Sequence, residues 1–216
     1  KMAESISHKA EVQADGSIID TVVIQRTHTG INREKFSGVR NVDWVRVYVP
    51  LGSQLIEAGG FEPVDSSLFE KPDAGWQFDQ DLYNERMAEE DLQSGVKIYE
   101  EADKTVFANW MQIDPEESKT VYLKYKLPFK IQEIEEADSI ANRIESLLNP
   151  NQKQLIPYSL LVQKQPGSLG SKIESVFKTS DNFNIVGQYP DYLVVDSNGW
   201  QIEDILKAKE FLAPLL

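Results

Sequence analysis

The chain has 216 residues, of which 41% are hydrophobic and none is cysteine, and its formal net charge is -13. A chain of this length buries roughly 70% of its unfolded surface, which is enough for one substantial core. The lack of cysteine excludes a disulfide-stapled fold and a cysteine-based metal site or nucleophile. The acidity disfavours nucleic-acid binding, which depends on Lys and Arg, and no apolar run reaches the roughly 18 residues that cross a bilayer.

The first part of the chain has the pattern of β-strands. Residues 8–14 alternate in polarity, Asp15-Gly16 favours a tight turn, and residues 17–29 are rich in β-branched side chains, so a hairpin is predicted. Residues 42–50 alternate in the same way, and a strand is expected to end at Pro50. Further strands are predicted over residues 51–58, 96–100, 105–113, 120–127 (ended by Pro128), 158–165, 172–178, 183–187, 192–196 and 200–204.

Two segments interrupt this run of strands. Residues 61–94 follow neither the helical nor the strand period, so a loop insert with one helical turn is expected, held to the body by Trp76 and Phe78. An apolar stripe at helical spacing predicts a short helical insert over about residues 132–153. Residues 205–216 are expected to form a terminal helix or a tether.

Runs of strands without alternating helices predict a mainly β protein. The expected fold is an antiparallel β-sandwich, Ig-like in architecture, with one loop insert and one short helical insert. Residues 1–216 are expected to form a single domain, with a separate smaller β subdomain over residues 168–216 as the alternative. The predicted core consists of Trp44, Val47, Trp110, Leu123, Tyr125, Leu160 and Val162.

Candidate acid/base and metal-binding residues are few. His8 and His28 lie on the two strands of the predicted hairpin, where a joint metal or acid/base role is conceivable, but without a partner carboxylate at a recognisable spacing each is better explained as structural. The acidic clusters at residues 89–91, 100–101 and 133–138 raise the possibility of paired glycosidase carboxylates, although 35 acidic residues make such pairs inevitable. A solvated surface is the simpler interpretation.

Other motifs are incomplete. Residues 196–199 resemble part of a calcium loop, but the spacing puts non-ligating side chains at its first and last positions, so a hairpin turn explains them better. Residues 166–172 lack the order of a phosphate loop, and no G-x-S-x-G is present. A Lys–Asn isopeptide crosslink between Lys9 or Lys124 and Asn109 is a further hypothesis, although the sequence alone does not bring these residues together.

The aromatic residues also fit a sugar-stacking platform, although a core role is the first interpretation. Trp76 is the exception because it lies in the insert, so it is the one residue named as a possible ligand contact. No catalytic, cofactor-binding or metal-binding residue is assigned, and no cofactor is expected.

Several short strings stand in a set order along the chain. They are Ile18–Ile24 running to Gly30, Trp44–Ser53, Lys104–Phe107, Asp114–Ser118, Tyr125–Pro128 and Leu160–Gly167. Together they resemble the C-terminal β-rich part of bacterial envelope proteins of the domain of unknown function 4012 family, over roughly residues 5–167. The Val-Pro-Leu-Gly-Ser and Val-Gln-Lys-Gln-Pro-Gly strings are the most specific, whereas residues 61–94 and the tail from 168 match less well.

The resemblance implies an extracellular, cell-surface setting, with a membrane anchor and a larger preceding domain outside this chain. It transfers no catalytic motif. The expected function is a non-catalytic extracellular domain of a membrane-anchored bacterial surface protein, in adhesion, scaffolding or envelope organisation. Its expected partner is a protein or glycan of the cell envelope, and not nucleic acid. A carbohydrate-binding module is the alternative, and a cell-wall glycan hydrolase the second alternative.

Overall fold

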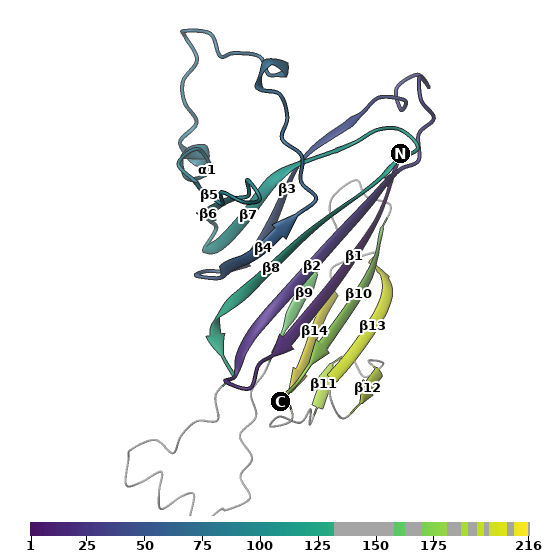
Figure 1. Ribbon diagram of the computed structural model, residues 1–216, viewed down its shortest axis with the longest axis vertical. Coiled ribbons are helices and arrows are strands. Elements are labelled where there is room, and N and C mark those ends of the chain that lie inside the picture. Colours follow the sequence, from purple (N-terminus) through teal and green to yellow (C-terminus); the bar gives the residue numbers. More distant parts are fainter. Residues whose placement is uncertain are drawn as a thin grey trace, which may run out of the picture.

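The computed structural model describes residues 1–131, 158–162, 170–180, 187–189, 194–196, 199–206 and 210–215 (Figure 1). The predicted helical insert at 132–153 lies outside the described residues. So do most of the predicted strand at 183–187, most of the string at 166–172 and the centre of the turn at 196–199.

The described strands form three sheets. The seven-stranded sheet has the order β12 (Val194–Asp196), β13 (Gly199–Leu206), β10 (Ser171–Lys178), β1 (Met2–Val12), β2 (Ser17–His28), β8 (Ser118–Lys130) and β4 (Gln54–Gly59). The four-stranded sheet has the order β3 (Asn41–Pro50), β7 (Lys104–Ile113), β6 (Lys97–Glu101) and β5 (Glu89–Glu90). The three-stranded sheet has the order β11 (Gly187–Tyr189), β14 (Glu210–Leu215) and β9 (Leu160–Val162).

The seven-stranded and four-stranded sheets pack face to face. Ala10 and Leu123 from the larger sheet share one buried cluster with Val49 and Phe107 from the smaller sheet. A second cluster joins Ile24 and Val121 to Val45, Met111 and Ile113 in the same way. Because alternate side chains of each strand enter these clusters, the two sheets form a sandwich, and the predicted mainly β class is confirmed.

The predicted hairpin is present as β1 and β2, although β1 spans Met2–Val12 and not residues 8–14. Gly16 in its turn has a φ of 76°, and a Cβ at this position would lie 1.8 Å from the Ile131 carbonyl oxygen, so glycine is required. The Asp15 carboxylate accepts hydrogen bonds from Lys130 Nζ and Ser17. These hydrogen bonds, that of Lys130 first, hold the pKa of Asp15 well below its usual value.

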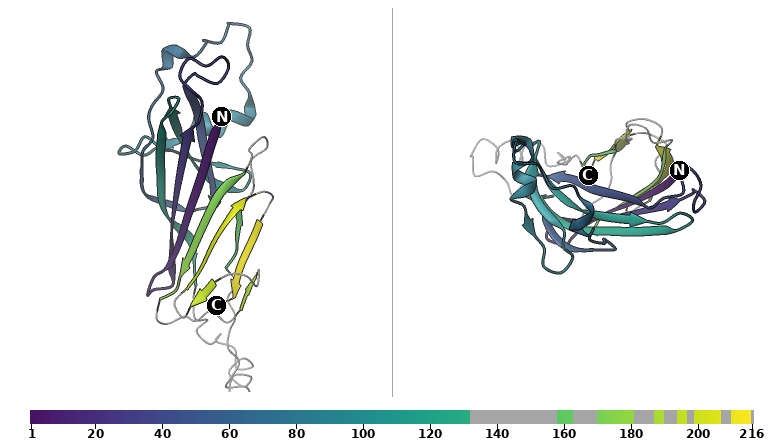
Figure 2. Two further views of the ribbon diagram at one scale, coloured as in Figure 1. Left: turned by 90° about the vertical axis from the view of Figure 1, so that its right-hand side faces the viewer. Right: turned by 90° about the horizontal axis from the view of Figure 1, so that it is seen from above.

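One strand pair departs from the antiparallel expectation. β10 pairs with β1 in parallel, and β13 continues the sheet beyond β10, so that the C-terminal strands lie beside the N-terminal strand (Figure 2). Parallel pairing needs a long connection, which the chain between β8 and β10 provides. Strands from the segment 168–216 therefore contribute both to the large sheet and to the three-stranded sheet.

Polar side chains on the inner face link β10, β1, β2 and β3. Ser171 Oγ donates a hydrogen bond to Glu4 Oε1 at 2.6 Å, and Arg26 Nε donates to Glu4 Oε2 at 2.6 Å. Arg26 also forms an ion pair with Asp43 of the four-stranded sheet. This half-buried network ties the two sheets together where the apolar clusters end, since each charge has an opposite partner.

The predicted core is correct for Leu123 and Tyr125 but wrong for the two tryptophans. Trp44 and Trp110 are opposite one another in register, with ring centroids 4.9 Å apart, on the outer face of the four-stranded sheet. Alternation along β3 explains this, because Val45, Val47 and Val49 point towards the core and Trp44 therefore points the other way. Val47 and Leu160 pack partly buried against the core, and Val162 lies in β9 with a side chain outside those described.

The predicted end of one strand and the predicted form of the C-terminal segment are also wrong. β8 continues through Pro128 to Lys130, because its register with β2 shifts between Ile19 and Ser17 and this irregularity takes the proline, which lacks an N–H, out of the ladder. The segment 205–216 forms neither a helix nor a tether where it is described. It contains the end of β13 and the strand β14, and β14 pairs with both β11 and β9.

Substitution of Leu123 by aspartate tests the assignment of strand faces. Leu123 is 2% exposed in the main cluster, so Leu123→Asp should lower the free energy of unfolding by more than about 4 kcal/mol and abolish folding. Thr120→Asp on the exposed face of the same strand, and Glu90→Lys on β5, should unfold at the wild-type temperature. Thermal unfolding followed by circular dichroism measures this, and equal melting temperatures for Leu123→Asp and Thr120→Asp would contradict the assignment.

Candidate functional site

The two histidines do not form a joint site. His8 is opposite Val22 and His28 is opposite Met2, so six residues of β1, or about 20 Å, separate them. The Gly30 N–H donates to His28 Nδ1, and His28 Nε2 donates to the Val39 carbonyl oxygen at 3.0 Å. His28 therefore closes the loop at residues 30–39, and a shared metal or acid/base role for the pair is wrong.

His8 instead belongs to a buried polar cluster that sequence reasoning missed. Its Nδ1 lies 2.9 Å from Ser175 Oγ on β10, and its Nε2 lies 3.6 Å from Asp20 Oδ2 on β2. The residue types are those of a Ser–His–Asp hydrolase triad, but the ring nitrogens are exchanged, because a catalytic serine faces Nε2 and the aspartate faces Nδ1. In addition, Ser175 is 0% exposed and His8 and Asp20 are each 4% exposed, so no substrate reaches the hydroxyl. The arrangement joins β10 to β1 and β2 and is structural.

Two buried tyrosines surround Asp20. Burial raises the pKa of the Tyr125 hydroxyl well above its usual value, and the charge of Asp20 and a hydrogen bond to it act in the same direction. Burial likewise raises the pKa of Tyr158, with the charge of Asp20 adding to the effect. Both hydroxyls therefore stay protonated in the folded chain to a higher pH than in the unfolded chain.

This difference makes stability depend on alkaline pH. Below about pH 10 the two tyrosines are protonated in both the folded and the unfolded chain. Above about pH 10 the unfolded chain loses these protons first. The free energy of unfolding therefore falls by about 1.4 kcal/mol per pH unit for each tyrosine. In urea unfolding between about pH 9 and pH 11, Tyr158→Phe should show a shallower decline than the wild type. Tyr83→Phe, at an exposed position, should keep the wild-type decline. Identical slopes for all three proteins would contradict the coupling.

The structure does not bring together the residues named for an isopeptide crosslink. Lys9 and Lys124 are both opposite Thr21, on the outer face of the large sheet. Asn109 is buried in the four-stranded sheet, where its Nδ2 donates to the Ser94 carbonyl oxygen at 3.1 Å. A crosslink needs both groups in one place, and here they lie on different faces of different sheets.

The acidic clusters serve local structure where they are described. Asp91 Oδ2 accepts hydrogen bonds from the backbone N–H and the hydroxyl of Ser94, and these bonds hold the pKa of Asp91 below its usual value. Glu101 pairs with Arg46 across the sheet. Within the described part of the chain, no group of three or more His, Asp or Glu side chains is arranged to hold a metal ion.

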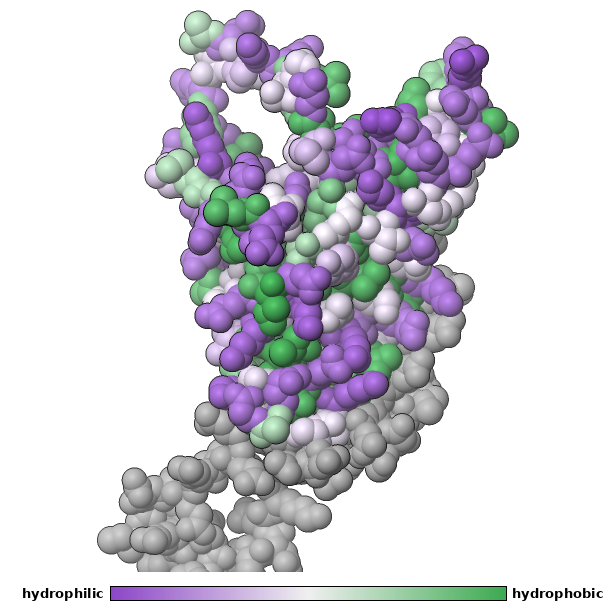
Figure 3. Space-filling view, viewed as in Figure 1, coloured by the Kyte–Doolittle hydropathy of each residue, from purple (hydrophilic) through white to green (hydrophobic). Residues whose placement is uncertain are grey.

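Exposed apolar side chains gather on two loops. The insert at 61–94, which contains η1 (Ser66–Leu68), η2 (Gln80–Leu82) and α1 (Tyr83–Arg86), projects from the same end of the sandwich as the loop at 30–40 (Figure 1). Figure 3 shows apolar side chains among hydrophilic ones on both projections. The exposed large apolar residues of the insert are Leu68, Phe69, Trp76, Phe78, Leu82, Tyr83, Met87 and Leu92, and those of the other loop are Ile31, Phe36 and Val39.

The base of the insert is attached to the outer face of the four-stranded sheet. Glu85 Oε2 accepts hydrogen bonds from Trp44 Nε1 at 3.2 Å and from the Tyr99 hydroxyl at 2.9 Å. Phe69 stacks on Trp110 with ring centroids 5.4 Å apart. Burial and, next, the hydrogen bond to Glu85 raise the pKa of Tyr99 well above its usual value, so this attachment holds at alkaline pH.

The structure corrects the predicted attachment. Trp76 is 67% exposed, so it does not hold the insert to the body, and Phe78 contacts Arg86 within the insert through a cation–π interaction. Glu85 and Phe69 make the attachment instead. Trp76 is exposed on the insert, and its role as a ligand contact stays a prediction. The insert contains ten acidic and two basic residues, a net charge of -8 within a chain of -13.

Comparison with known proteins gives distant structural similarity only. No protein-family model matches the chain, and no curated protein matches it. Leukotriene A4 hydrolase from Saccharomyces cerevisiae is similar at 9% identity with a TM-score of 0.40, over 99% of this chain and 29% of that one. An M1 zinc metallopeptidase from Deinococcus radiodurans is similar at 9% identity with a TM-score of 0.31, over 99% of this chain and 41% of that one. The chain thus spans less than half the length of either protein.

A helix able to cross a membrane would need a long apolar run. None of the helices in the described part of the chain has the length and apolar character to do so.

Proposed function

We propose that the chain is a non-catalytic, outward-facing domain of a bacterial surface protein whose membrane anchor lies outside this chain. It binds a protein of the cell envelope, in adhesion, scaffolding or envelope organisation. The observation that carries the proposal is the set of exposed large apolar side chains on the insert at 61–94, whose base is attached to the sandwich. Apolar side chains gathered on an otherwise polar surface are typical of protein contact sites.

The attachment gives this surface a defined place. Because Glu85 and Phe69 bind the insert to the rigid sheet, its exposed apolar side chains are presented at one end of the sandwich, and less order is lost on binding than from a free tether. The net charge of -8 favours a cationic protein surface and disfavours anionic polymers and lipids. Sandwich domains commonly present binding loops at one end in this way.

Binding to isolated bacterial envelopes tests the proposal. The purified chain is titrated onto envelopes from Gram-positive and Gram-negative bacteria, before and after protease treatment of the envelopes. The variant Trp76→Ala/Leu92→Ser removes two exposed side chains and should weaken binding about 30-fold or more, as expected for loss of a contact worth about 2 kcal/mol. Ile56→Ser, an exposed apolar position on β4, is the control and should bind as the wild type does.

The envelope-binding experiment has outcomes that support the proposal and outcomes that contradict it. Saturable binding that protease treatment abolishes and that the insert variant loses supports the proposal. Equal binding by the wild type and the insert variant, or no binding by the wild type, contradicts it. Because the altered side chains are exposed, both variants should keep the wild-type melting temperature.

A carbohydrate-binding function is the second candidate, and the exposed ring of Trp76 is the observation that favours it. An exposed indole face can stack on a sugar ring. Glycan-array binding that survives in Ile56→Ser and is lost in Trp76→Ala would support this candidate. Array binding that Trp76→Ala does not change would exclude Trp76 as the stacking residue.

A further inference from the structure

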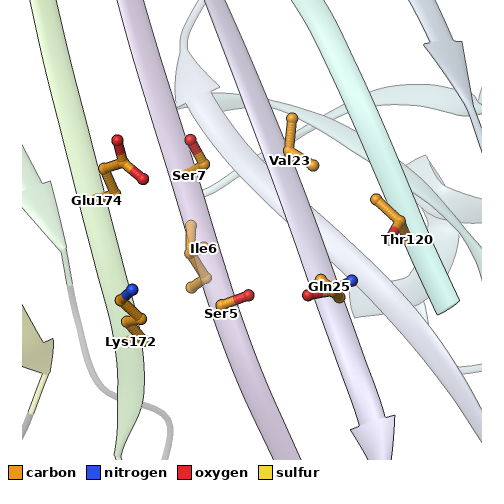
Figure 4. Close-up of a pocket in the computed structure, with 8 residues that line it drawn as sticks. All are labelled: Ser5, Ile6, Ser7, Val23, Gln25, Thr120, Lys172 and Glu174. Atoms are coloured by element: carbon orange, nitrogen blue, oxygen red, sulfur yellow. The ribbon is translucent and has the colours of Figure 1, made fainter. Parts of the chain in front are cut away.

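A shallow groove lies on the outer face of the seven-stranded sheet, away from the insert. It crosses β10, β1, β2 and β8 and has a volume of about 280 Å³ (Figure 4). Register makes its lining two rows of side chains across these strands. The first row is Lys172, Ser5, Gln25 and Thr120, and the second row begins with Glu174, Ser7 and Val23.

Small side chains produce the hollow. Ser5, Ser7 and Thr120 leave the middle of the sheet face low, whereas in the next row along the strands Lys9 and Lys124 stand on either side of Thr21. The β10 side of the groove comes from residues 167 positions away from Ser5 and Ser7 in the chain. The groove therefore exists only when β10 is paired with β1.

The lining has a specific chemical character. Hydroxyl groups and the Gln25 amide both donate and accept hydrogen bonds, and Val23 supplies an apolar surface between them. Lys172 and Glu174 contribute opposite charges, so the groove is neutral on a chain whose net charge is -13. A neutral ligand with many hydroxyl and amide groups matches these features better than a cation or an anion does.

We infer that this groove is a binding site for a neutral, hydroxyl-rich sugar residue of a glycan. The sugar hydroxyl groups replace water on the two serines, Gln25 and Thr120, and one apolar sugar face rests on Val23. The volume is close to the lower limit of about 300 Å³ for small-molecule sites, so the groove takes a short stretch of the glycan, with weak affinity. The inference is independent of the proposed protein contact at the insert.

Calorimetric titration of the full chain with three defined oligosaccharides tests this site. The probes are a tetramer of N-acetylglucosamine, which is neutral, a tetramer of glucosamine, which is cationic, and a tetramer of galacturonate, which is anionic. The neutral tetramer should bind with a Kd of about 1 mM or lower. The cationic and anionic tetramers should bind at least about tenfold more weakly, which corresponds to about 1.4 kcal/mol.

Matched variants locate the binding. Ser7→Phe fills the groove and should abolish binding of the neutral tetramer, whereas Thr21→Phe, on the same outer face but outside the groove, should bind as the wild type does. Glu174→Lys makes the groove positive and should turn the preference towards the galacturonate tetramer. Both phenylalanine variants are checked for the wild-type melting temperature, and Ser7→Thr provides a conservative replacement that should retain binding.

The same experiment can overturn the inference. No heat of binding with the neutral tetramer, equal loss of binding in Thr21→Phe and Ser7→Phe, or tighter binding of the cationic tetramer would each do so. The proposed function is tested separately. If the groove inference fails in one of these ways, envelope binding by Ser7→Phe that still depends on the insert leaves the proposed function intact. Loss of glycan binding in Trp76→Ala but not in Ser7→Phe would place the sugar at the insert and not in the groove.

Discussion

The antiparallel pairing of β2 with β1 on one side and β8 on the other is the constraint on which the rest of the structure depends. It places Ile18, Val22 and Ile24 on one inner face with the apolar residues of β8, and on this face the four-stranded sheet packs. Since side chains alternate along each strand, the same pairing also sets the outer face. A slip of one residue would exchange the buried clusters for the groove lining, so the core and the groove depend on one register.

The C-terminal part of the chain joins this sheet through side-chain hydrogen bonds as well as through the backbone ladder. Ser171 and Ser175 of β10 bond to Glu4 and His8 of β1. In the parallel pair His8 is directly opposite Ser175, so the two contacts specify the register of β10. Buried polar groups stabilise a fold when they are partnered, and they disfavour other alignments in which they would lose their partners. The resemblance of Ser175, His8 and Asp20 to a hydrolase triad reflects this role, because no substrate can approach a fully buried hydroxyl.

The two proposed binding surfaces use different parts of the same frame. The insert at 61–94 presents apolar and acidic side chains at one end, attached through Glu85 and Phe69. The groove presents small polar side chains on a sheet face and has no net charge. The proposed domain contacts a protein at one end and a glycan on a sheet face. Two weak contacts on one domain strengthen its overall binding, because the first contact raises the effective concentration for the second. The chemistry of each surface, and not the fold, distinguishes the two partners.

The sequence by itself determined the mainly β class, most strand positions, the loop insert and the inward face of β8. These follow from local alternation and turn residues, which act within a few residues of one another. The tertiary structure decided the parallel pairing of β10, the outer position of Trp44 and Trp110, and the attachment of the insert by Glu85 and Phe69. It also decided the His8 cluster and the groove, whose members have no motif and are spread over the chain from Ser5 to Ser175. Local periodicity tells which side of a strand a residue faces, but only the order and register of distant strands decide what it meets there.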